Sequence, residues 1–256
     1  MPQSSAIEWA WDPRSPNTIA PATETLDPIL TLADFNVIKY DEEAKGLDLA
    51  ACCGSPWYWM VNHVVTLDEH DDTGHPYKRF PAKPHLQAVA EDWWWCGLRY
   101  PILAFPKSRK QIMTWVISLL FFGECQFRAG RRNIVQSQDE DESKAIIEKM
   151  HGVWNRQAPW IRTGAEWTTS SAKFANDSTF LSVPGGPSQL QGPTPSGYLM
   201  DEVGDHKEAA ATFEAALAAV VGSSGTVLGG RRMVLVGRCP QSWWYNEFLA
   251  DKLGAK

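Results

Sequence analysis

Short apolar runs alternate with longer helical segments between residues 100 and 236, and this alternation restricts the fold more than any other feature of the chain. Apolar runs of a few residues are typical of buried strands, whereas apolar residues three and four positions apart are typical of helices. We expect strands at 100–105, 133–137, 178–183, 198–200 and 233–236, and helices at 111–122, 139–154 and 206–221. Strands that alternate with helices form a mainly parallel sheet covered on both faces, so the sequence predicts an α/β fold.

Length and composition exclude several classes of protein. The chain has 256 residues, of which 44% are hydrophobic and 21% charged, which is typical of a globular protein and not of a disordered or collagen-like one. Its net charge is 24 − 30 = −6, so any contact with nucleic acid must be confined to a local patch or shared among several subunits. The longest apolar stretch, residues 112–123, is too short for a membrane span and predicts a buried helix. The start of the chain has no basic-then-apolar leader, so we do not expect secretion or a membrane.

The first third of the chain differs in composition from the rest. Residues 1–26 are rich in proline, serine and threonine, and residues 67–84 combine three prolines with a cluster of acids. Such segments leave no room for a long element. We expect an irregular N-terminal extension, residues 1–83, that packs on a compact domain formed by residues 84–256.

Metal and hydrolase motifs are missing from the sequence. The five cysteines form no CxxC pair, and the six histidines include no pair four positions apart. We interpret the cysteines as reduced thiols, and the spacing disfavours both a structural zinc site and a zinc hydrolase. The chain has no GxSxG motif, which disfavours a serine hydrolase.

Two polar stretches follow predicted strands and carry the chemistry of a nucleotide site. The first is the loop Lys107, Ser108, Arg109, Lys110, Gln111, Ile112, Met113 and Thr114; the second is the pair Asp201 and Glu202. A loop between a strand and a helix holds phosphate with backbone N–H groups and a basic side chain, and a Ser/Thr hydroxyl at the helix start holds Mg²⁺. Of two acids on a later strand, one binds the magnesium shell and the other activates the attacking water. Because successive side chains on a strand point in opposite directions, we expect Asp201 and Glu202 to have different tasks.

Each stretch alone has another interpretation. The usual GxxxxGK[ST] pattern is broken, because Ile112 and Met113 stand where a glycine and a lysine are expected. The loop taken alone is an exposed basic turn before a buried helix, and the two acids taken alone cap the next helix. Their order, spacing and strand–loop–helix contexts together favour a nucleotide site.

Six segments, in the same order, resemble a known family. They are PHLQ (84–87), FPKSRKQIMT (105–114), NIVQSQDEDESKAIIEKM (133–150), FLSVPGG (180–186), QGPTPSGYLMDE (191–202) and VLVGRCP (234–240). Together they resemble the ATPase region of the large terminase subunit, the motor that drives DNA into tailed-phage and herpesvirus capsids. The resemblance extends over residues 58–244.

The resemblance implies a fold, two small-molecule partners and a role for each site residue. The fold is a P-loop fold of the additional-strand (ASCE, RecA-like) type, and the partners are ATP and Mg²⁺. Lys107 matches the variant in which the phosphate-binding lysine stands at the start of the loop. Thr114 and Asp201 match the magnesium ligands, with Asp201 acting through water, and Glu202 matches the catalytic glutamate. Gln87 matches the glutamine that reads adenine, although an exposed helical glutamine is an equal alternative.

The resemblance also implies macromolecular partners. These are double-stranded DNA, a portal protein, a small terminase subunit and further copies of the chain in a ring on the portal, all in the host cytoplasm. Three departures weaken the implied coupling. Gln191 replaces the expected arginine finger, so Arg131, Arg132, Arg162 and Arg238 are alternatives; the coupling segment 236–239 lacks its hydroxyls; and no nuclease segment follows Pro240.

Two other functions remain open. The first is a P-loop module that has lost hydrolysis and binds nucleotide or the portal, for which Ile112, Met113 and Gln191 speak. The second is another nucleic-acid translocase such as a helicase, which needs a second RecA-like domain that this chain is too short to contain.

Overall fold

The computed structural model describes residues 42–68, 72, 74–95, 100, 102–107, 112–190, 194–221 and 231–238. The chain divides into two compact units, each treated separately below: Met1–Ala88 with His151–Thr163, and Val89–Met150 with Gly164–Lys256. The expected boundary between residues 83 and 84 stays a prediction.

The first unit contains a pair of helices and a two-stranded sheet. Helix α2 (Glu42–Gly54) is followed at once by α3 (Pro56–His63). Ser55 starts α3 by accepting a hydrogen bond from the Tyr58 N–H, and Pro56 fits the first helical turn because it has no N–H to satisfy. Strands β1 (Val65–Leu67) and β2 (Tyr77–Arg79) pair antiparallel, and α4 (Pro84–Trp95) begins in this unit.

The second unit is built on a seven-stranded sheet with the order β3-β9-β8-β4-β7-β6-β5. The parallel strands are β3 (Ile102–Lys107), β9 (Arg232–Arg238), β8 (Gly197–Met200), β4 (Arg132–Gln136) and β7 (Thr179–Val183). Strands β6 (Ser171–Phe174) and β5 (Ala165–Trp167) extend the sheet antiparallel. The mainly parallel sheet confirms the predicted fold class, whereas the β5–β6 extension was not predicted because strands of three and four residues give too short a pattern.

The order of the strands places the last strand of the chain inside the sheet. Strand β9 lies between β3 and β8, although both precede it in sequence. This inserted strand is the additional strand of the fold that the sequence predicted. Because β3, β8 and β9 are parallel, their carboxyl ends meet at one edge of the sheet.

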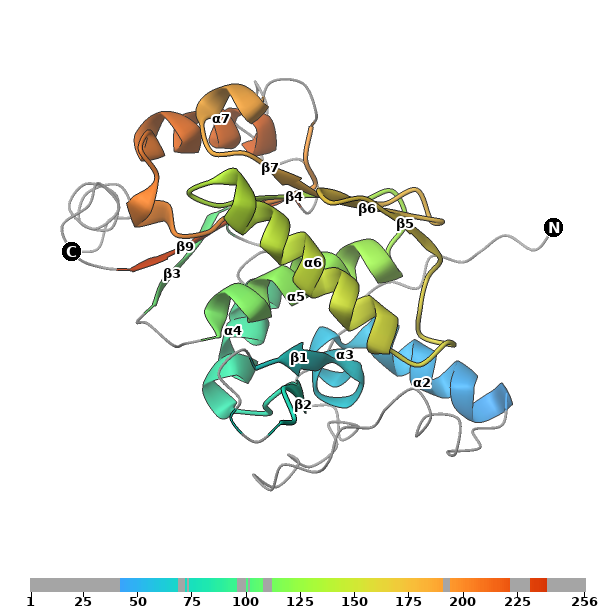
Figure 1. The fold of residues 1–256 in the computed structure, drawn as a ribbon. Coiled ribbons are helices and arrows are strands. Elements are labelled where there is room, and N and C mark those ends of the chain that lie inside the picture. Colours follow the sequence, from blue (N-terminus) through green and yellow to red (C-terminus); the bar gives the residue numbers. More distant parts are fainter. Residues whose placement is uncertain are drawn as a thin grey trace. The chain divides into compact units, whose positions relative to one another are not determined.

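Helices α5 (Met113–Phe127) and α7 (Ala209–Val221) pack against opposite faces of the sheet (Figure 1). Tyr198 and Met200 of β8 share a buried cluster with Phe213 of α7. Gly197 faces the other side, where an added Cβ would lie 2.3 Å from Phe121 of α5, so glycine is required for this close approach. The alternating faces of β8 thus separate the two helices.

Helix α5 is buried along almost its whole length, which confirms that the longest apolar stretch forms a buried helix. Among the described residues, no helix is both long and apolar enough to cross a membrane. The remaining elements are α6 (Glu140–Arg156), which the chain follows from the second unit into the first, and two short 3-10 turns, η2 (Pro187–Leu190) and η3 (Val203–Asp205).

Candidate functional site

The candidate site lies at the edge of the sheet where β3, β8 and β9 end. Strand β3 ends at Lys107, β8 ends just before Asp201, and β9 ends at Arg238. Helix α5 starts at Met113, so Thr114 lies in its first turn. Parallel pairing therefore brings together residues that are far apart in the sequence.

Lys107 is the centre of the site. Its Nζ atom lies 2.7 Å from Thr114 Oγ1, 3.2 Å from Asp201 Oδ1 and 3.0 Å from Glu202 Oε1. The side chain is only 7% exposed, so these interactions are made largely away from water. A buried ammonium needs such acceptors, and the two carboxylates supply the compensating charge.

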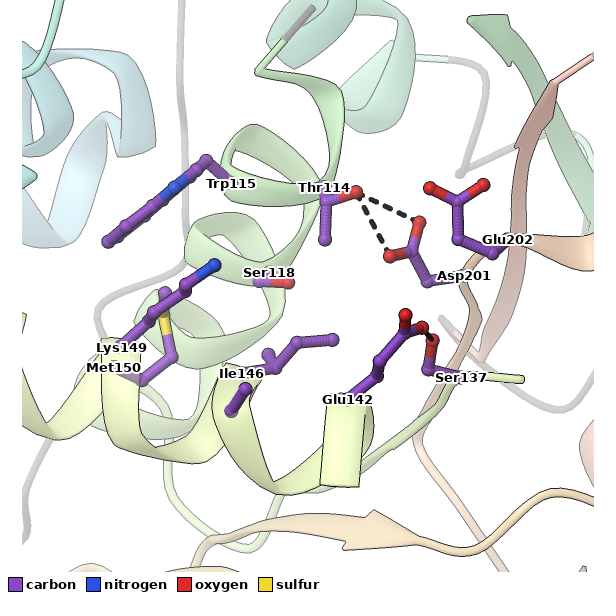
Figure 2. A pocket seen from close by; sticks show the side chains of 11 residues that line it. Thr114, Trp115, Ser118, Ser137, Glu142, Ile146, Lys149, Met150, Asp201 and Glu202 are labelled. Carbon is purple, nitrogen blue, oxygen red and sulfur yellow. Dashed lines mark hydrogen bonds between the residues drawn. The ribbon is translucent and has the colours of Figure 1, made fainter. Parts of the chain in front are cut away.

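Thr114 and Asp201 present oxygen atoms to the same point. The Thr114 hydroxyl lies 2.9 and 3.0 Å from the two carboxylate oxygens of Asp201 (Figure 2). Adjacent oxygen ligands on one octahedral Mg²⁺ ion are about 2.9 Å apart, given bonds of 2.0–2.1 Å. Hydroxyl and carboxylate oxygens are also the donors that this ion prefers, so the two side chains fit a magnesium site.

Burial raises the pKa of the Asp201 carboxyl above its ordinary value, and the nearby Glu202 carboxylate acts in the same direction. Lys107 and the Thr114 hydroxyl oppose this rise by stabilising the ionised form. The carboxylate thus depends on a neighbouring cation to remain charged in this position.

Glu202 has a left-handed backbone conformation, with φ of 50° and ψ of 42°. This conformation is uncommon for a residue with a Cβ atom and is found mostly at functional sites or tight turns. Strand alternation, which ends at Met200, does not govern the pair, so both acids reach the Lys107 ammonium. The left-handed residue provides the sharp turn that makes this convergence possible.

Two further side chains at the site were not assigned this position from the sequence. Arg238 Nε lies 3.4 Å from Glu202 Oε2, and the Arg238 guanidinium binds Asp205 at 2.6 Å. His206 Nε2 lies 2.8 Å from the Asp201 carbonyl oxygen and is buried, which lowers the pKa of the ring. His206 follows the acidic pair closely, so its proximity was open to sequence reasoning, whereas the contact with Arg238 depends on strand order.

A cavity of about 250 Å³ continues the site between α5 and α6 (Figure 2). Thr114, Asp201 and Glu202 line one end, and Trp115, Lys149 and Met150 line the other. Ser137 donates a hydrogen bond of 2.9 Å to Glu142 at the polar side. The Ser118 hydroxyl is buried, lines the cavity and has no hydrogen-bond partner among the described residues. The cavity is therefore polar enough to hold ordered water beside the acids.

The sequence-predicted residues have different outcomes. Lys107, Thr114, Asp201 and Glu202 come together, and Ile112 and the buried Met113 lie at the start of α5 without a side-chain cap. Ser108, Arg109, Lys110, Gln111 and Gln191 lie outside the described residues. Gln87 belongs to α4 in the first unit, whereas the four converging residues belong to the second.

The alternative arginines also separate. Arg131 and Arg132 lie where β4 begins, at the edge of the sheet opposite to Asp201, and Arg131 binds Glu124 at 2.8 Å. Arg162 belongs to the first unit, where it stacks on Trp154. Of these four arginines, Arg238 is the one that lies at the candidate site.

No protein-family model matches the chain, and no curated protein matches it by sequence. Solved structures do resemble it. The large terminase of bacteriophage HK97 has a TM-score of 0.55 and 9% identity over 72% of this chain and 37% of that chain. The large terminase ATPase domain of Thermus phage P74-26 has a TM-score of 0.41 and 15% identity, over 58% of this chain and 63% of that domain. The large terminase of another thermophilic bacteriophage, solved in complex with ADP, has a TM-score of 0.37 and 15% identity, over 58% of this chain and 36% of that chain.

This chain thus spans little more than a third of the length of the HK97 protein. At 9% identity the likeness concerns the path of the backbone and not the side chains. The conclusion is that the chain has the fold of a phage large terminase, as its six sequence segments predicted.

Proposed function

We propose that the chain is an ATP-hydrolysing motor domain that powers the packaging of double-stranded viral DNA into a procapsid. One observation carries this proposal: Lys107, Thr114, Asp201 and Glu202 converge where parallel strands end and a helix begins. This is the place at which α/β sheets bind their ligands, and the four residue types are those that phosphoryl transfer requires. The shared fold with a large terminase supports the packaging role.

In the proposed reaction, Lys107 binds the β- and γ-phosphates. Its ammonium then exchanges the carboxylates of Asp201 and Glu202 for phosphate oxygens, which carry more negative charge. Thr114 and Asp201 hold Mg²⁺, which neutralises charge on the β- and γ-phosphates when it is bound. The helix start at Met113 adds backbone N–H groups that favour an anion.

Glu202 takes the proton from the attacking water. The water oxygen forms a bond to the γ-phosphorus while the bond to the β-phosphate oxygen breaks, giving ADP and phosphate. Release of Glu202 from Lys107 frees the carboxylate to act as the base, and Arg238 remains beside it to hold its orientation. The polar side of the cavity, with Ser118 and Ser137, provides a place for the water before attack.

The partners of the proposed motor are DNA, a portal protein, a small terminase subunit and further copies of the chain in a ring. The net charge of −6 gives one copy no general attraction for phosphate, so we expect DNA affinity to come from weak sites summed around a ring. The isolated chain should therefore be mostly monomeric and should bind DNA with a Kd weaker than about a micromolar at physiological salt. Sedimentation and DNA titration measure both properties.

A single assay separates this function from a module that binds nucleotide without hydrolysis. ATP turnover of the full chain is measured at high protein concentration, with and without Mg²⁺ and double-stranded DNA, beside equilibrium binding of ATP. Turnover that requires Mg²⁺ and increases with DNA is expected. ATP binding without turnover would instead favour the hydrolysis-deficient module, for which Ile112 and Met113 speak, and absence of both binding and turnover would refute the nucleotide site.

A further inference from the structure

Three side chains with metal-binding atoms meet inside the first unit, and none of them takes part in the proposed reaction. Asp48 and Cys52 lie one turn apart on α2, and His63 is the last residue of α3. Their metal-binding atoms all lie within 4.8 Å of one another, and all three residues are buried. The serine-capped start of α3 turns the chain back after α2, which brings His63 to the face that carries Asp48 and Cys52.

Asp48 is held firmly in this cluster. Its Oδ1 atom lies 3.0 Å from both the Tyr58 hydroxyl and His63 Nε2, and its Oδ2 atom accepts a bond of 2.8 Å from Trp160 Nε1. A buried carboxylate requires such donors. Hydrogen bonds of this kind also orient the carboxylates that bind metals, so Tyr58 and Trp160 are suitable supports for a ligand.

Two polar groups in the cluster are not explained by this network. His63 Nδ1 is buried and has no hydrogen-bond partner among the described residues. Cys52 is completely buried beside Asp48, and burial, together with the charge of Asp48, raises the pKa of its thiol. A small apolar side chain would serve packing equally well at Cys52, so packing alone does not require a sulfur atom there.

We propose that Asp48, Cys52 and His63 form a binding site for one divalent transition-metal ion, with zinc as the best match. A carboxylate oxygen, a thiolate and an imidazole nitrogen form a mixed set that suits Zn²⁺ and does not suit Mg²⁺ or Ca²⁺, which take oxygen ligands. Ionised Asp48 and Cys52 with neutral His63 carry two negative charges, so a divalent ion makes the buried site neutral. Neutrality matters because isolated buried charge is costly.

The spacing is close to that of a tetrahedral site. Oxygen and nitrogen ligands on one zinc ion are about 3.3 Å apart, and a thiolate and an oxygen are about 3.5 Å apart, given the usual bond lengths. The Asp48 oxygen and the His63 nitrogen are 3.0 Å apart, and no pair of ligand atoms exceeds 4.8 Å. Side-chain rotations of about an ångström bring the set to ideal distances. Three protein ligands leave the fourth position for water, as in zinc sites with an open position.

The experiment uses the full chain after removal of metal by a chelator, titrated first with Co²⁺ and then with Zn²⁺. We expect one equivalent of Co²⁺ to give a thiolate-to-cobalt charge-transfer band and the visible absorption of a four-coordinate ion, and Zn²⁺ to abolish both. Cys52→Ala should lose the charge-transfer band, whereas the neighbouring Cys53→Ala should keep it, since Cys53 is outside the cluster. Millimolar Mg²⁺ should not compete.

A second measurement guards against misfolding of the variants. The melting temperature is recorded for each metal-free variant and again with one equivalent of Zn²⁺, because binding to the folded state alone raises it. We expect a rise for the wild type and Cys53→Ala, and none for Cys52→Ala or for His63→Gln. No charge-transfer band in the wild type, or a band that persists in Cys52→Ala, overturns the proposal. Neither readout depends on ATP turnover, so the result is independent of the proposed function.

Discussion

Arg238 and Glu202 face one another at the edge of the sheet, with Arg238 Nε 3.4 Å from Glu202 Oε2. The other carboxylate oxygen of Glu202 lies 3.0 Å from Lys107 Nζ, so the acid is held between two cations on neighbouring strands. In the proposed reaction Lys107 leaves this arrangement for phosphate. Arg238 then becomes the residue that orients the carboxylate.

Replacement of Arg238 should therefore affect turnover more than binding. We expect Arg238→Gln to lower kcat by about 10-fold or more with little change in KM, because the base loses its orientation while the phosphate contacts remain. Arg238→Lys should restore part of the activity, since an ammonium can still pair with Glu202. Arg231→Gln, just before the opposite end of the same strand, is the control and should behave like the wild type.

Glu202→Gln tests the base directly. The amide keeps the size of the side chain and its hydrogen bonds but cannot accept the proton, so turnover should fall by about 10² to 10⁴-fold while ATP still binds. Steady-state turnover and equilibrium binding are compared in the same preparation. Wild-type turnover in this variant, given an active parent, would contradict the catalytic assignment.

Lys107 should be more important for nucleotide binding than Lys110. Lys107→Ala removes a charge-assisted contact with phosphate, which should cost about 2 to 4 kcal/mol of binding free energy, or roughly 30-fold to 1000-fold in Kd. Lys110→Ala should cost less than about 1 kcal/mol. Lys144→Ala is a further control, because this lysine is exposed and pairs with Glu140 on α6. A larger loss for Lys110→Ala than for Lys107→Ala would reverse the assignment of the loop.

A buried acid should be important for stability at the opposite edge of the sheet. Glu124 is fully buried, and although burial favours its neutral form, the guanidinium groups of Arg232, Arg131 and Arg128 hold the pKa of this carboxyl below its ordinary value. Glu124→Gln leaves these arginines without their counter-charge and should lower the free energy of unfolding by about 3 to 5 kcal/mol. Chemical denaturation measures the loss. Exposed Glu166→Gln should change stability by less than about 0.5 kcal/mol.

His206 should make the fold sensitive to mild acid. Burial lowers the pKa of the ring below 6.5, against the opposing effect of the Asp201 carbonyl and of the nearby carboxylates of Asp201, Asp205 and Glu142. Between the folded and the unfolded pKa the unfolded state binds more protons, so stability is present above pH 6.5 and is lost as the pH falls through the folded value. The loss should approach at most about 1.4 kcal/mol per pH unit.

The raised pKa of Asp201 acts with the opposite sign, because its folded form binds more protons than its unfolded form above pH 3.8. A comparison of the wild type with His206→Gln isolates the histidine, since the glutamine amide can still donate to the Asp201 carbonyl. The unfolding free energy of the variant should decrease less between pH 7 and pH 5. Equal slopes for both proteins would exclude His206 as the titrating group.

Much of the fold could be predicted because it depends on local patterns. The apolar runs before Lys107 and Asp201 became β3 and β8, and the helical periodicity after residue 139 became α6. Such patterns reflect which face of an element is buried, and burial is the main favourable contribution to folding. The β5–β6 extension was missed because its two strands are too short to show a period.

By itself, the sequence determined the types of residue at the candidate site, their order along the chain and the elements that carry them, because each follows from local periodicity and side-chain chemistry. Only the tertiary structure decided which of them meet. The insertion of β9 between β3 and β8 brings Arg238 beside Glu202, and the turn between α2 and α3 brings His63 to Asp48 and Cys52. Such meetings depend on contacts between residues distant in sequence, whose free energy is shared by the whole packed core and leaves no periodic trace in the chain.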